Sequence, residues 1–238
     1  MAGLAGVTAA ILAGGLGSRL RPVVADRPKV LAAVGGRPFL TYLLDQLASA
    51  GIAQVVLCTG YLGEQVRATL GEVYGLLRLV YSQESSPLGT AGALRLALPF
   101  FPSDSVLVMN GDSFCPVDLR AFWEWHGAQG AEATLLVVQA PDTSFFGWVQ
   151  LDARGRVLAF KEKEKSPTPE LRMINAGIYL IERRFLKMIP PGRTVSLERD
   201  FFPAHLGRKL YGYQCQASFI DIGTPETYVE AEKFLQGN

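Results

Sequence analysis

The sequence predicts an α/β fold in which helices flank a mixed, mainly parallel sheet. In the first half of the chain, short β-rich segments alternate with segments of helical periodicity, as is typical of a parallel sheet. From Ala131 onwards the β-rich segments follow one another more closely, which predicts a smaller second lobe on the same sheet. The 238 residues, 49% of them hydrophobic, suffice for one domain with a buried core.

The expected elements can be placed in chain order. Strands are expected at 7–13, 54–59, 77–81 and 106–109, and helices at 38–50, at 62–70 and from about 89. Helix 38–50 has the clearest signals, because Pro38 suits a first turn, apolar residues recur at helical spacing and Gly51 suits a C-cap. In the second lobe, 151–156 is typical of a hairpin turn, and helices are expected near 183–188 and 227–235.

The charge balance restricts the partners that the chain can have. Twenty-three Lys and Arg residues oppose 22 Asp and Glu residues, so the net charge of +1 argues against a general nucleic-acid or membrane surface. The apolar start, 1–16, lacks the basic region of a signal sequence, and we interpret it as the first strand. The three cysteines are odd in number and lack metal-ligand spacing, which favours a reducing compartment. We therefore expect a cytoplasmic protein with a small anionic ligand.

The loop after the first strand concentrates groups that bind phosphate. Three glycines lie within four positions, at Gly14, Gly15 and Gly17. They let backbone N–H groups converge on oxygen atoms, and Arg19 and Lys29 add positive charge. The loop lacks the Gly-Lys-Ser/Thr ending of a P-loop, and Leu20 stands where the dinucleotide motif has its third glycine. An ordinary tight turn would not explain the cations, so we expect a nucleoside triphosphate site.

Further motifs follow in an order that resembles the sugar-1-phosphate nucleotidyltransferase family. They are Gln83 with 87–93, Asn110-Gly111-Asp112, 160–163, 174–177 and 219–225. Within the family, 146–149, 195–203 and 219–228 most resemble the D-glycero-α-D-manno-heptose 1-phosphate guanylyltransferases. The resemblance implies a Rossmann-like nucleotide-diphospho-sugar transferase fold in one domain over 1–238. Residues 1–130 would form the nucleotide-binding half and 131–238 the sugar-phosphate-binding half, as a small sugar-binding lobe.

The resemblance implies that a nucleoside monophosphate passes from a nucleoside triphosphate to a sugar 1-phosphate, with release of pyrophosphate. A phosphomonoester with a second pKa of about 6 is largely dianionic at neutral pH, so no general base is required. The protein must instead align two anions and offset their repulsion. Arg19 would hold the β and γ phosphates, and Lys29 would lie near the α-phosphate. Asp112 and Asp221 would bind the cofactor Mg²⁺ through oxygen ligands.

The resemblance also implies the binding residues and the substrates. Those for the nucleotide are Leu12, Ala13, Gly14, Gly15, Gly17, Gln83, Gly89 and Thr90. Those for the sugar phosphate are Gly147, Glu162, Lys163 and Asn175. The expected substrates are GTP and heptose 1-phosphate. The alternatives are a mannose-1-phosphate guanylyltransferase or a glucose-1-phosphate thymidylyl- or uridylyltransferase, because those enzymes share most of the motifs. A homodimer is also considered.

Several of these residues have a structural explanation as well. Asp112 and Asp221 suit turns that follow strands, and the alternating charges of 161–165 are typical of a solvated loop. Ser196 suits the N-cap of a helix with Glu198 in its first turn. For that reason 196–198 is not included among the expected site residues.

Three other functions compete with this interpretation. A metal-dependent glycosyltransferase usually shows Asp-x-Asp, whereas Asn110-Gly111-Asp112 supplies one carboxylate. A molybdopterin guanylyltransferase also begins with a glycine loop, but it would leave the later sugar-site motifs without a purpose. A catalytically silent regulatory subunit would be favoured by loss of Arg19, Lys29 or either aspartate, and all four are present.

Overall fold

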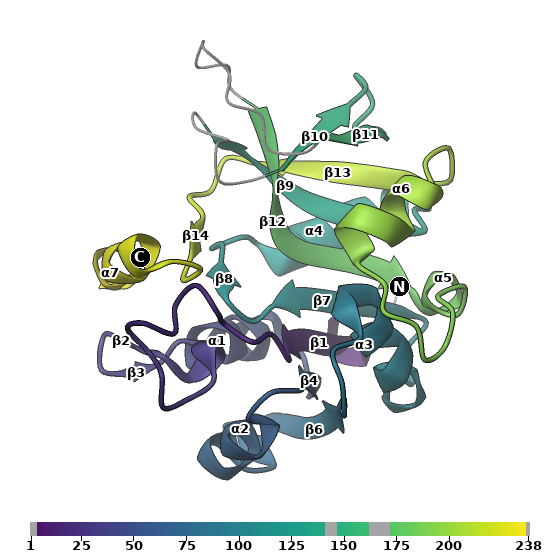
Figure 1. The fold of residues 1–238 in the computed structure, drawn as a ribbon. Coiled ribbons are helices and arrows are strands. Elements are labelled where there is room, and N and C mark those ends of the chain that lie inside the picture. The colour runs from purple at the N-terminus through teal and green to yellow at the C-terminus, as the bar shows by residue number, and fades with distance from the viewer. Residues whose placement is uncertain (1–3, 141–146, 162–171, 237–238) are drawn as a thin grey trace.

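A single large sheet organises the chain. The computed structural model describes residues 4–140, 147–161 and 172–236. In this part of the chain ten strands form one sheet in the order β11-β10-β12-β7-β1-β4-β6-β5, and β9 and β13 continue it from β12 (Figure 1). Its parallel strands around the centre are β1 (Thr8–Ala13), β4 (Gln54–Thr59), β6 (Leu77–Gln83) and β7 (Ser105–Asn110). These strands confirm the mixed α/β sheet that the sequence predicts.

Helices cover both faces of this sheet. Successive residues of a strand point to opposite faces, so an apolar strand makes both faces apolar and both must be buried. Ala9 and Ile11 of β1 pack in the same cluster as the apolar residues of α1 (Leu40–Ala50). Ala10 packs in the other cluster, with α3 (Gly89–Ala97). The short helix α2 (Gly63–Leu70) follows β4.

Some helix ends agree with the local sequence, but Pro38 does not lie in the first turn of α1 as expected, because it belongs to the short strand Arg37–Pro38 and the helix begins at Leu40. Gly51 ends α1 in the left-handed conformation with φ 87°, as expected of its C-cap. Helix α4 (Leu119–Gln129) was not among the expected elements, although it carries clear signals at both ends. Asp118 caps its N-terminus by accepting from the N–H groups of Arg120 and Ala121, and Gly130 ends it at φ 53°.

The second half adds mainly antiparallel strands to the same sheet. They are β9 (Ala133–Ala140), β10 (Trp148–Leu151), β11 (Val157–Lys161), β12 (Arg172–Glu182) and β13 (Leu210–Cys215). Strand β12 pairs antiparallel with β7 and so joins the two halves. The expected hairpin turn between β10 and β11 is present, because Asp152 N–H donates to the Arg156 carbonyl at 2.9 Å.

Short elements complete the architecture. They are β2 (Ala33–Val34), β3 (Arg37–Pro38), β5 (Val73–Tyr74), β8 (Ser113–Phe114), β14 (Ile220–Asp221), α5 (Arg183–Leu186), α6 (Phe202–Ala204), α7 (Pro225–Gln236), the 3₁₀ turns η1 (Leu4–Gly6), η2 (Lys29–Leu31) and η3 (Leu98–Phe100), and the π turn η4 (Leu197–Phe201). Strands β8 and β14 pair antiparallel beside the start of α7, which lies next to them in Figure 1. None of the helices in the described ranges is long and apolar enough to cross a membrane.

Candidate active site

A cavity of about 280 Å³ opens at the carboxyl ends of the parallel strands. This is where ligands bind in open α/β sheets. Its walls include eight of the expected site residues, namely Leu12, Ala13, Gly14, Gly15, Lys29, Gly89, Thr90 and Asp112. They also include seven others, namely Leu16, Val30, Cys58, Glu84, Pro87, Ala93 and Asn110. The glycine loop and the Gly89–Thr90 turn therefore face one common space.

Lys29 is held in this cavity by its neighbours. It begins η2 after Pro28, and its ammonium donates to Asp112 Oδ2 at 2.6 Å. The side chain of Lys29 is only 11% exposed, whereas that of Asp112 is 42% exposed. Gly17 lies outside the cavity lining but supports Lys29, because a Cβ at Gly17, whose φ is +60°, would come within 3.1 Å of the Lys29 Cβ. A side chain at position 17 would thus displace the lysine.

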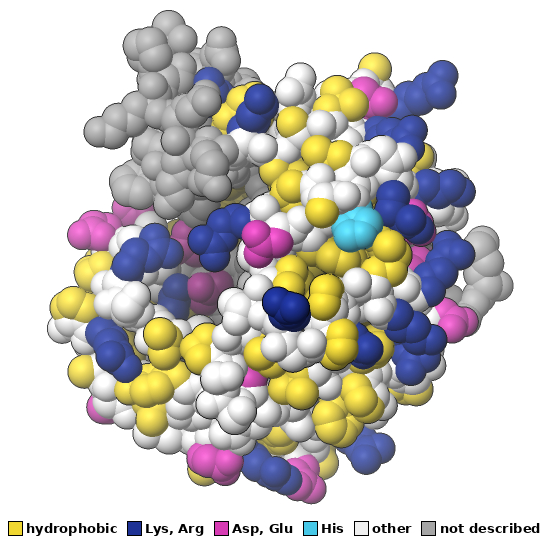
Figure 2. Space-filling model, turned by 45° about the vertical axis from the view of Figure 1, so that its right-hand side comes forward, with side chains coloured by type: hydrophobic (Ala, Val, Ile, Leu, Met, Phe, Trp, Pro, Cys, Tyr) yellow, Lys and Arg dark blue, Asp and Glu magenta, His cyan; other side chains and the backbone are white. Residues whose placement is uncertain are grey.

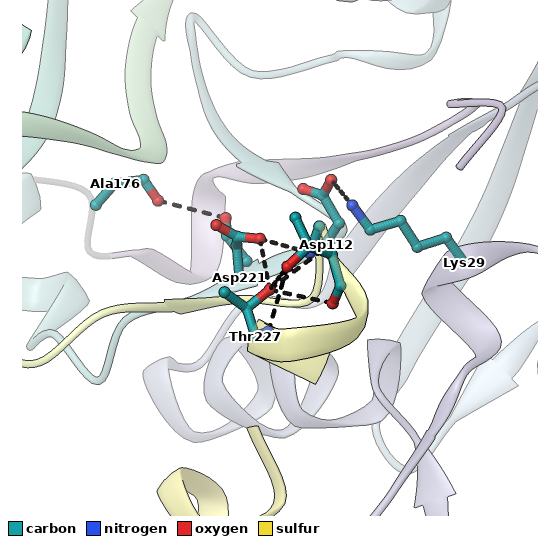
Figure 3. A network of polar contacts seen from close by, with 8 residues as sticks. Lys29, Asp112, Ala176, Asp221 and Thr227 are labelled. Atoms are coloured by element: carbon teal, nitrogen blue, oxygen red, sulfur yellow. Dashed lines mark hydrogen bonds and ion pairs between the residues drawn. The ribbon is translucent and has the colours of Figure 1, made fainter. Parts of the chain in front are cut away.

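The two aspartates come together through the β8–β14 pair. Asp221 pairs with Ser113, and the N–H of Ile222 donates to the carbonyl of Asp112 at 2.9 Å. The Asp221 carboxylate accepts from the Gly223 N–H at 2.5 Å and from the Thr227 hydroxyl at 3.3 Å. Figure 3 shows the Asp221 and Thr227 cluster with Lys29 reaching towards Asp112. Two aspartates that are far apart in the sequence therefore lie on neighbouring backbone segments.

Arg19 lies at the edge of the same site. It is not part of the cavity lining, but a Cβ added at Gly223 would lie 3.4 Å from its guanidinium and also against Asp221. The face of the molecule drawn in Figure 2 has a hollow in which basic and acidic side chains lie next to one another. The structure thus gathers Arg19, Lys29, Asp112 and Asp221, the four residues expected to carry the chemistry.

The donor set determines which metal could bind here. In the described ranges, no group of three or more His, Cys, Asp or Glu residues could hold a metal ion by itself. Mg²⁺ is commonly held by one or two carboxylates and completes its coordination with water and substrate phosphates. Asp112 and Asp221 offer hard oxygen ligands of this kind beside the glycine loop, so these two residues fit Mg²⁺ better than a thiophilic metal.

Glu84, which was not among the expected site residues, lines the cavity, whereas Gln83 does not. Gln83 ends β6 exposed to solvent and lies near Gly63, outside the cavity. The Leu88 N–H donates to one carboxylate oxygen of Glu84 at 3.0 Å, and a Cβ at Gly14 would approach the other oxygen within 2.9 Å. Burial raises the pKa of the Glu84 carboxyl despite the hydrogen bond from Leu88.

Cys58 also lines the cavity, yet it is not a candidate nucleophile. It is completely buried on β4, and burial raises the pKa of its thiol to about 12. The thiolate is the nucleophilic form of cysteine, so this residue stays inert near neutral pH. Cys58 therefore contributes apolar packing.

A second cavity of about 400 Å³ lies in the second half of the chain. Its lining consists of Gly147, Trp148, Val149, Phe160, Lys161, Asn175, Glu198, Arg199 and Pro203. Two of the expected sugar-site residues, Gly147 and Asn175, are therefore present, whereas Glu162 and Lys163 lie outside the described residues. Position 147 has little room for a side chain, because a Cβ there would lie 2.9 Å from the Lys161 carbonyl oxygen.

Comparison with known proteins agrees with this geometry. The family model described as "Nucleotidyl transferase" matches residues 8–238. The chain belongs to the nucleotidyl transferase family. It is 40% identical over 233 residues to a mannose-1-phosphate guanylyltransferase of Mycobacterium tuberculosis, covering 96% of this chain and 64% of that relative. It is 38% identical to a D-glycero-alpha-D-manno-heptose 1-phosphate guanylyltransferase of Aneurinibacillus thermoaerophilus, covering 96% of this chain and 98% of that one.

Solved structures of this nucleotidyl transferase fold also match. HddC from Yersinia pseudotuberculosis complexed with GMP-PN superposes with a TM-score of 0.85 at 28% identity, covering 96% of this chain and 99% of that chain. A putative glucose-1-phosphate thymidylyltransferase from Bacillus anthracis superposes with a TM-score of 0.83 at 25% identity, covering 96% and 94%. These matches confirm the nucleotide-diphospho-sugar transferase fold and the family that the sequence motifs indicate.

Proposed function

We propose that this protein transfers a nucleoside monophosphate from a nucleoside triphosphate to a sugar 1-phosphate. The observation that carries the proposal is the convergence of Lys29, Asp112, Asp221 and Arg19 beside the glycine-loop cavity. A silent regulatory subunit would have no need to keep this set together. The second cavity supplies separate space for the sugar.

The reaction depends on stabilising the negative charge of two phosphate groups more than on proton transfer. An oxygen of the sugar phosphate forms a bond to the α-phosphorus, the bond from that phosphorus to the α–β bridging oxygen breaks, and pyrophosphate leaves. Lys29 would stabilise the α-phosphoryl oxygens, and the glycine-loop amides and Arg19 would bind the remaining phosphates. Mg²⁺ bound by Asp112 and Asp221 would neutralise part of the phosphate charge.

The proposed nucleotide is GTP. The two relatives of highest identity described above are named guanylyltransferases. Glu84 adds a physical reason, since guanine presents two adjacent donors, the N1–H and the 2-amino group, and a carboxylate can accept from both. Adenine and the pyrimidines lack such a neighbouring pair of donors. We therefore assign base recognition to Glu84 and Gly89, and the role expected of Gln83 stays a prediction.

The proposed sugar substrate is D-glycero-α-D-manno-heptose 1-phosphate. The Aneurinibacillus enzyme named for this substrate matches this chain over 98% of its own length. Mannose 1-phosphate is the second candidate, because the Mycobacterium relative is named for it. The roles expected of Glu162 and Lys163 remain predictions. We also propose a cytoplasmic location, which the free thiols of Cys58, Cys115 and Cys215 favour. The homodimer stays a prediction.

Pyrophosphate release tests the proposed function. Wild-type protein with Mg²⁺ is assayed with ATP, GTP, CTP, UTP and dTTP against heptose, mannose, glucose and N-acetylglucosamine 1-phosphates. We expect the fastest release with GTP and heptose 1-phosphate. Release with a different pair would keep the reaction and correct the substrates, whereas no release with any pair would reject the proposed activity.

A further inference from the structure

The carboxylate of Glu198 accepts hydrogen bonds from three hydroxyl groups at the wall of the second cavity. Tyr179 donates to one of its oxygens at 2.8 Å, and Thr90 and Ser196 donate to the other at 3.0 and 2.9 Å. These donors come from β12, from the first turn of α3 and from the N-cap of η4. Glu198 is therefore tied to three separate elements.

Each of these hydroxyls is itself oriented by an N–H group. The donors are Leu197 N to Thr90 at 2.7 Å, Arg199 N to Ser196 at 3.2 Å and Asn175 Nδ2 to Tyr179 at 2.8 Å. A hydroxyl that accepts a fixed hydrogen bond directs its own hydrogen elsewhere, and all three hydrogens point at Glu198. Every hydrogen bond in the network therefore donates towards Glu198, whose carboxylate is the final acceptor.

Docking of the chain segment does not explain this network. The backbone already anchors the segment, because the Val195 carbonyl accepts from Ala91 N–H at 3.0 Å and from Gly92 N–H at 3.2 Å. The Val195 N–H also donates to the Leu88 carbonyl at 2.8 Å. The three hydroxyl groups are therefore not needed to anchor this segment. They suit the Glu198 side chain if it must keep one orientation.

Tyr179 is suited to this task by its surroundings. It is fully buried on β12, and burial, together with the neighbouring Glu198 charge, raises the pKa of its hydroxyl well above the ordinary value. It therefore remains a neutral donor at every working pH. Through Asn175 and Glu198 the same hydroxyl contacts two polar side chains of the second cavity.

A carboxylate has about four acceptor positions, so three hydroxyl donors leave capacity for one more. Glu198 shares the cavity lining with Asn175 and Trp148. Sugar hydroxyls are hydrogen-bond donors that such a carboxylate can accept from. A site that hydrogen-bonds a substrate hydroxyl strongly disfavours an analogue without that hydroxyl. The two cavities are also linked here, because Thr90 lines the first.

We propose that Glu198 determines sugar specificity by accepting a hydrogen bond from one hydroxyl of the sugar 1-phosphate, with Tyr179, Thr90 and Ser196 as positioning residues. The identity of the ligand as a sugar 1-phosphate rests on the proposed function. Thr90 donates to Glu198 and also lines the first cavity, so it fixes the position of this acceptor relative to the nucleotide cavity.

Two variants test the proposal by separating the two substrates. Glu198→Gln should raise the KM for the sugar 1-phosphate about tenfold or more and leave the KM for GTP within about twofold, because one charged hydrogen bond is lost. Tyr179→Phe should raise the sugar KM by a smaller factor. A monodeoxy mannose 1-phosphate series should show one hydroxyl whose removal weakens wild type but not Glu198→Gln.

Matched controls exist away from both cavities. Glu182→Gln alters a carboxylate that accepts from the Ser105 hydroxyl at 2.5 Å, and Tyr74→Phe removes a hydroxyl that donates to Asp45 at 2.9 Å. Neither residue lines a cavity described above. Both control variants should leave the sugar KM unchanged, even if their melting temperatures fall as far as those of the test variants.

Calorimetric titration with mannose 1-phosphate and heptose 1-phosphate separates this proposal from the proposed function. Weaker binding to Glu198→Gln than to wild type supports the role of Glu198, whether or not turnover occurs. Equal binding, or equal changes in the KM of both substrates, would overturn it. Absence of pyrophosphate release from wild type would instead reject the proposed function, and the binding comparison would still decide the role of Glu198.

Discussion

At the scale of single residues, Lys29 is the side chain that we expect to contribute most to the chemical step of the proposed function. Its side chain is largely buried, and its ammonium lies 2.6 Å from Asp112 Oδ2 beside the glycine loop. A fixed cation of this kind stabilises charge that develops on the α-phosphoryl oxygens, and such a contact commonly contributes about 10²-fold or more in rate. We predict that Lys29→Ala lowers kcat by about 10²-fold in steady-state assays.

The control for Lys29 is Lys187→Ala, which removes a lysine at the solvent-exposed end of α5. That variant should keep the wild-type kcat. A kcat for Lys29→Ala within a few fold of wild type would show that Lys29 has no role in the transition state.

Asp112 and Asp221 provide the second residue-scale prediction. If both carboxylates hold the proposed Mg²⁺, Asp112→Ala and Asp221→Ala should each abolish Mg²⁺-dependent pyrophosphate release while the protein stays folded. Titration with Mn²⁺, followed by electron paramagnetic resonance, should show loss of the bound ion. Asp26→Ala, which changes an exposed aspartate paired with Arg27, is the control. Unchanged activity in both test variants would reject the metal assignment.

Glu84 provides the third prediction, which concerns the base. If its carboxylate accepts from both guanine donors, the enzyme should prefer GTP to inosine triphosphate, which lacks the 2-amino group. Glu84→Gln should reduce that preference by about tenfold, since a charged hydrogen bond becomes a weaker neutral one. The ratio of kcat/KM for the two nucleotides measures the effect. An unchanged ratio would mean that Glu84 does not contact the base.

At the scale of elements, an ion pair joins the N-terminal ends of β9 and β13. Its contribution to the stability of the fold depends on pH. Glu132 precedes β9, Arg208 precedes β13, and the two side chains form a bidentate pair. The hydrogen bond from Arg208 lowers the pKa of Glu132 below its ordinary value of 4.5. The stabilisation is therefore present above that value and is lost as the pH falls below it through the folded-state pKa.

We predict that Glu132→Gln lowers the melting temperature at pH 7 and that the difference from wild type shrinks below about pH 4.5. Calorimetric melting curves at several pH values measure it, with the exposed Glu124→Gln as the control. A difference that stays constant across this range would show that the ion pair does not contribute through the charge of Glu132.

Local patterns determine what the sequence could predict about the elements. Strand β4 and helix α1 could be predicted because their signals are local. The apolar pattern of each element and the C-cap glycine of α1 lie within the element or next to it. Helix α4 was missed although Asp118 and Gly130 mark its ends, since its apolar face is weaker. Glu84 was missed because neighbouring residues at a strand end point in opposite directions, and local sequence does not show which one faces the cavity.

Contacts between distant segments explain the remaining differences. The glycine loop, Lys29 and Asp112 could be predicted as one site because each follows a parallel strand of the same sheet or belongs to its loops. The hydrogen bonds from Thr90 and Tyr179 to Glu198 depend on how η4 packs against α3 and β12. Sequence spacing carries no information about that packing, so the local residues indicated only a helix start at Ser196 and Glu198, and the segment 195–203 entered the functional interpretation through resemblance alone.

At the scale of the whole molecule, the two cavities described above both lie along the large sheet. The parallel strands place the glycine loop at the first, and β12, which pairs with β7, carries Asn175 into the second. The β8–β14 pair brings Asp221 from the end of the chain back to Asp112. If the first cavity binds the triphosphate and the second binds the sugar, as proposed, this arrangement holds the two substrates side by side, as nucleotidyl transfer requires.

The most direct test of this account follows the α-phosphate of the nucleotide. Wild-type protein is incubated with Mg²⁺, heptose 1-phosphate and GTP that is radiolabelled at the α-phosphate, and the products are separated. We predict that the label appears in a nucleotide sugar, with one pyrophosphate released for each. Label that remains in GTP, or that appears in GDP or GMP without any nucleotide sugar, would contradict the proposed transfer.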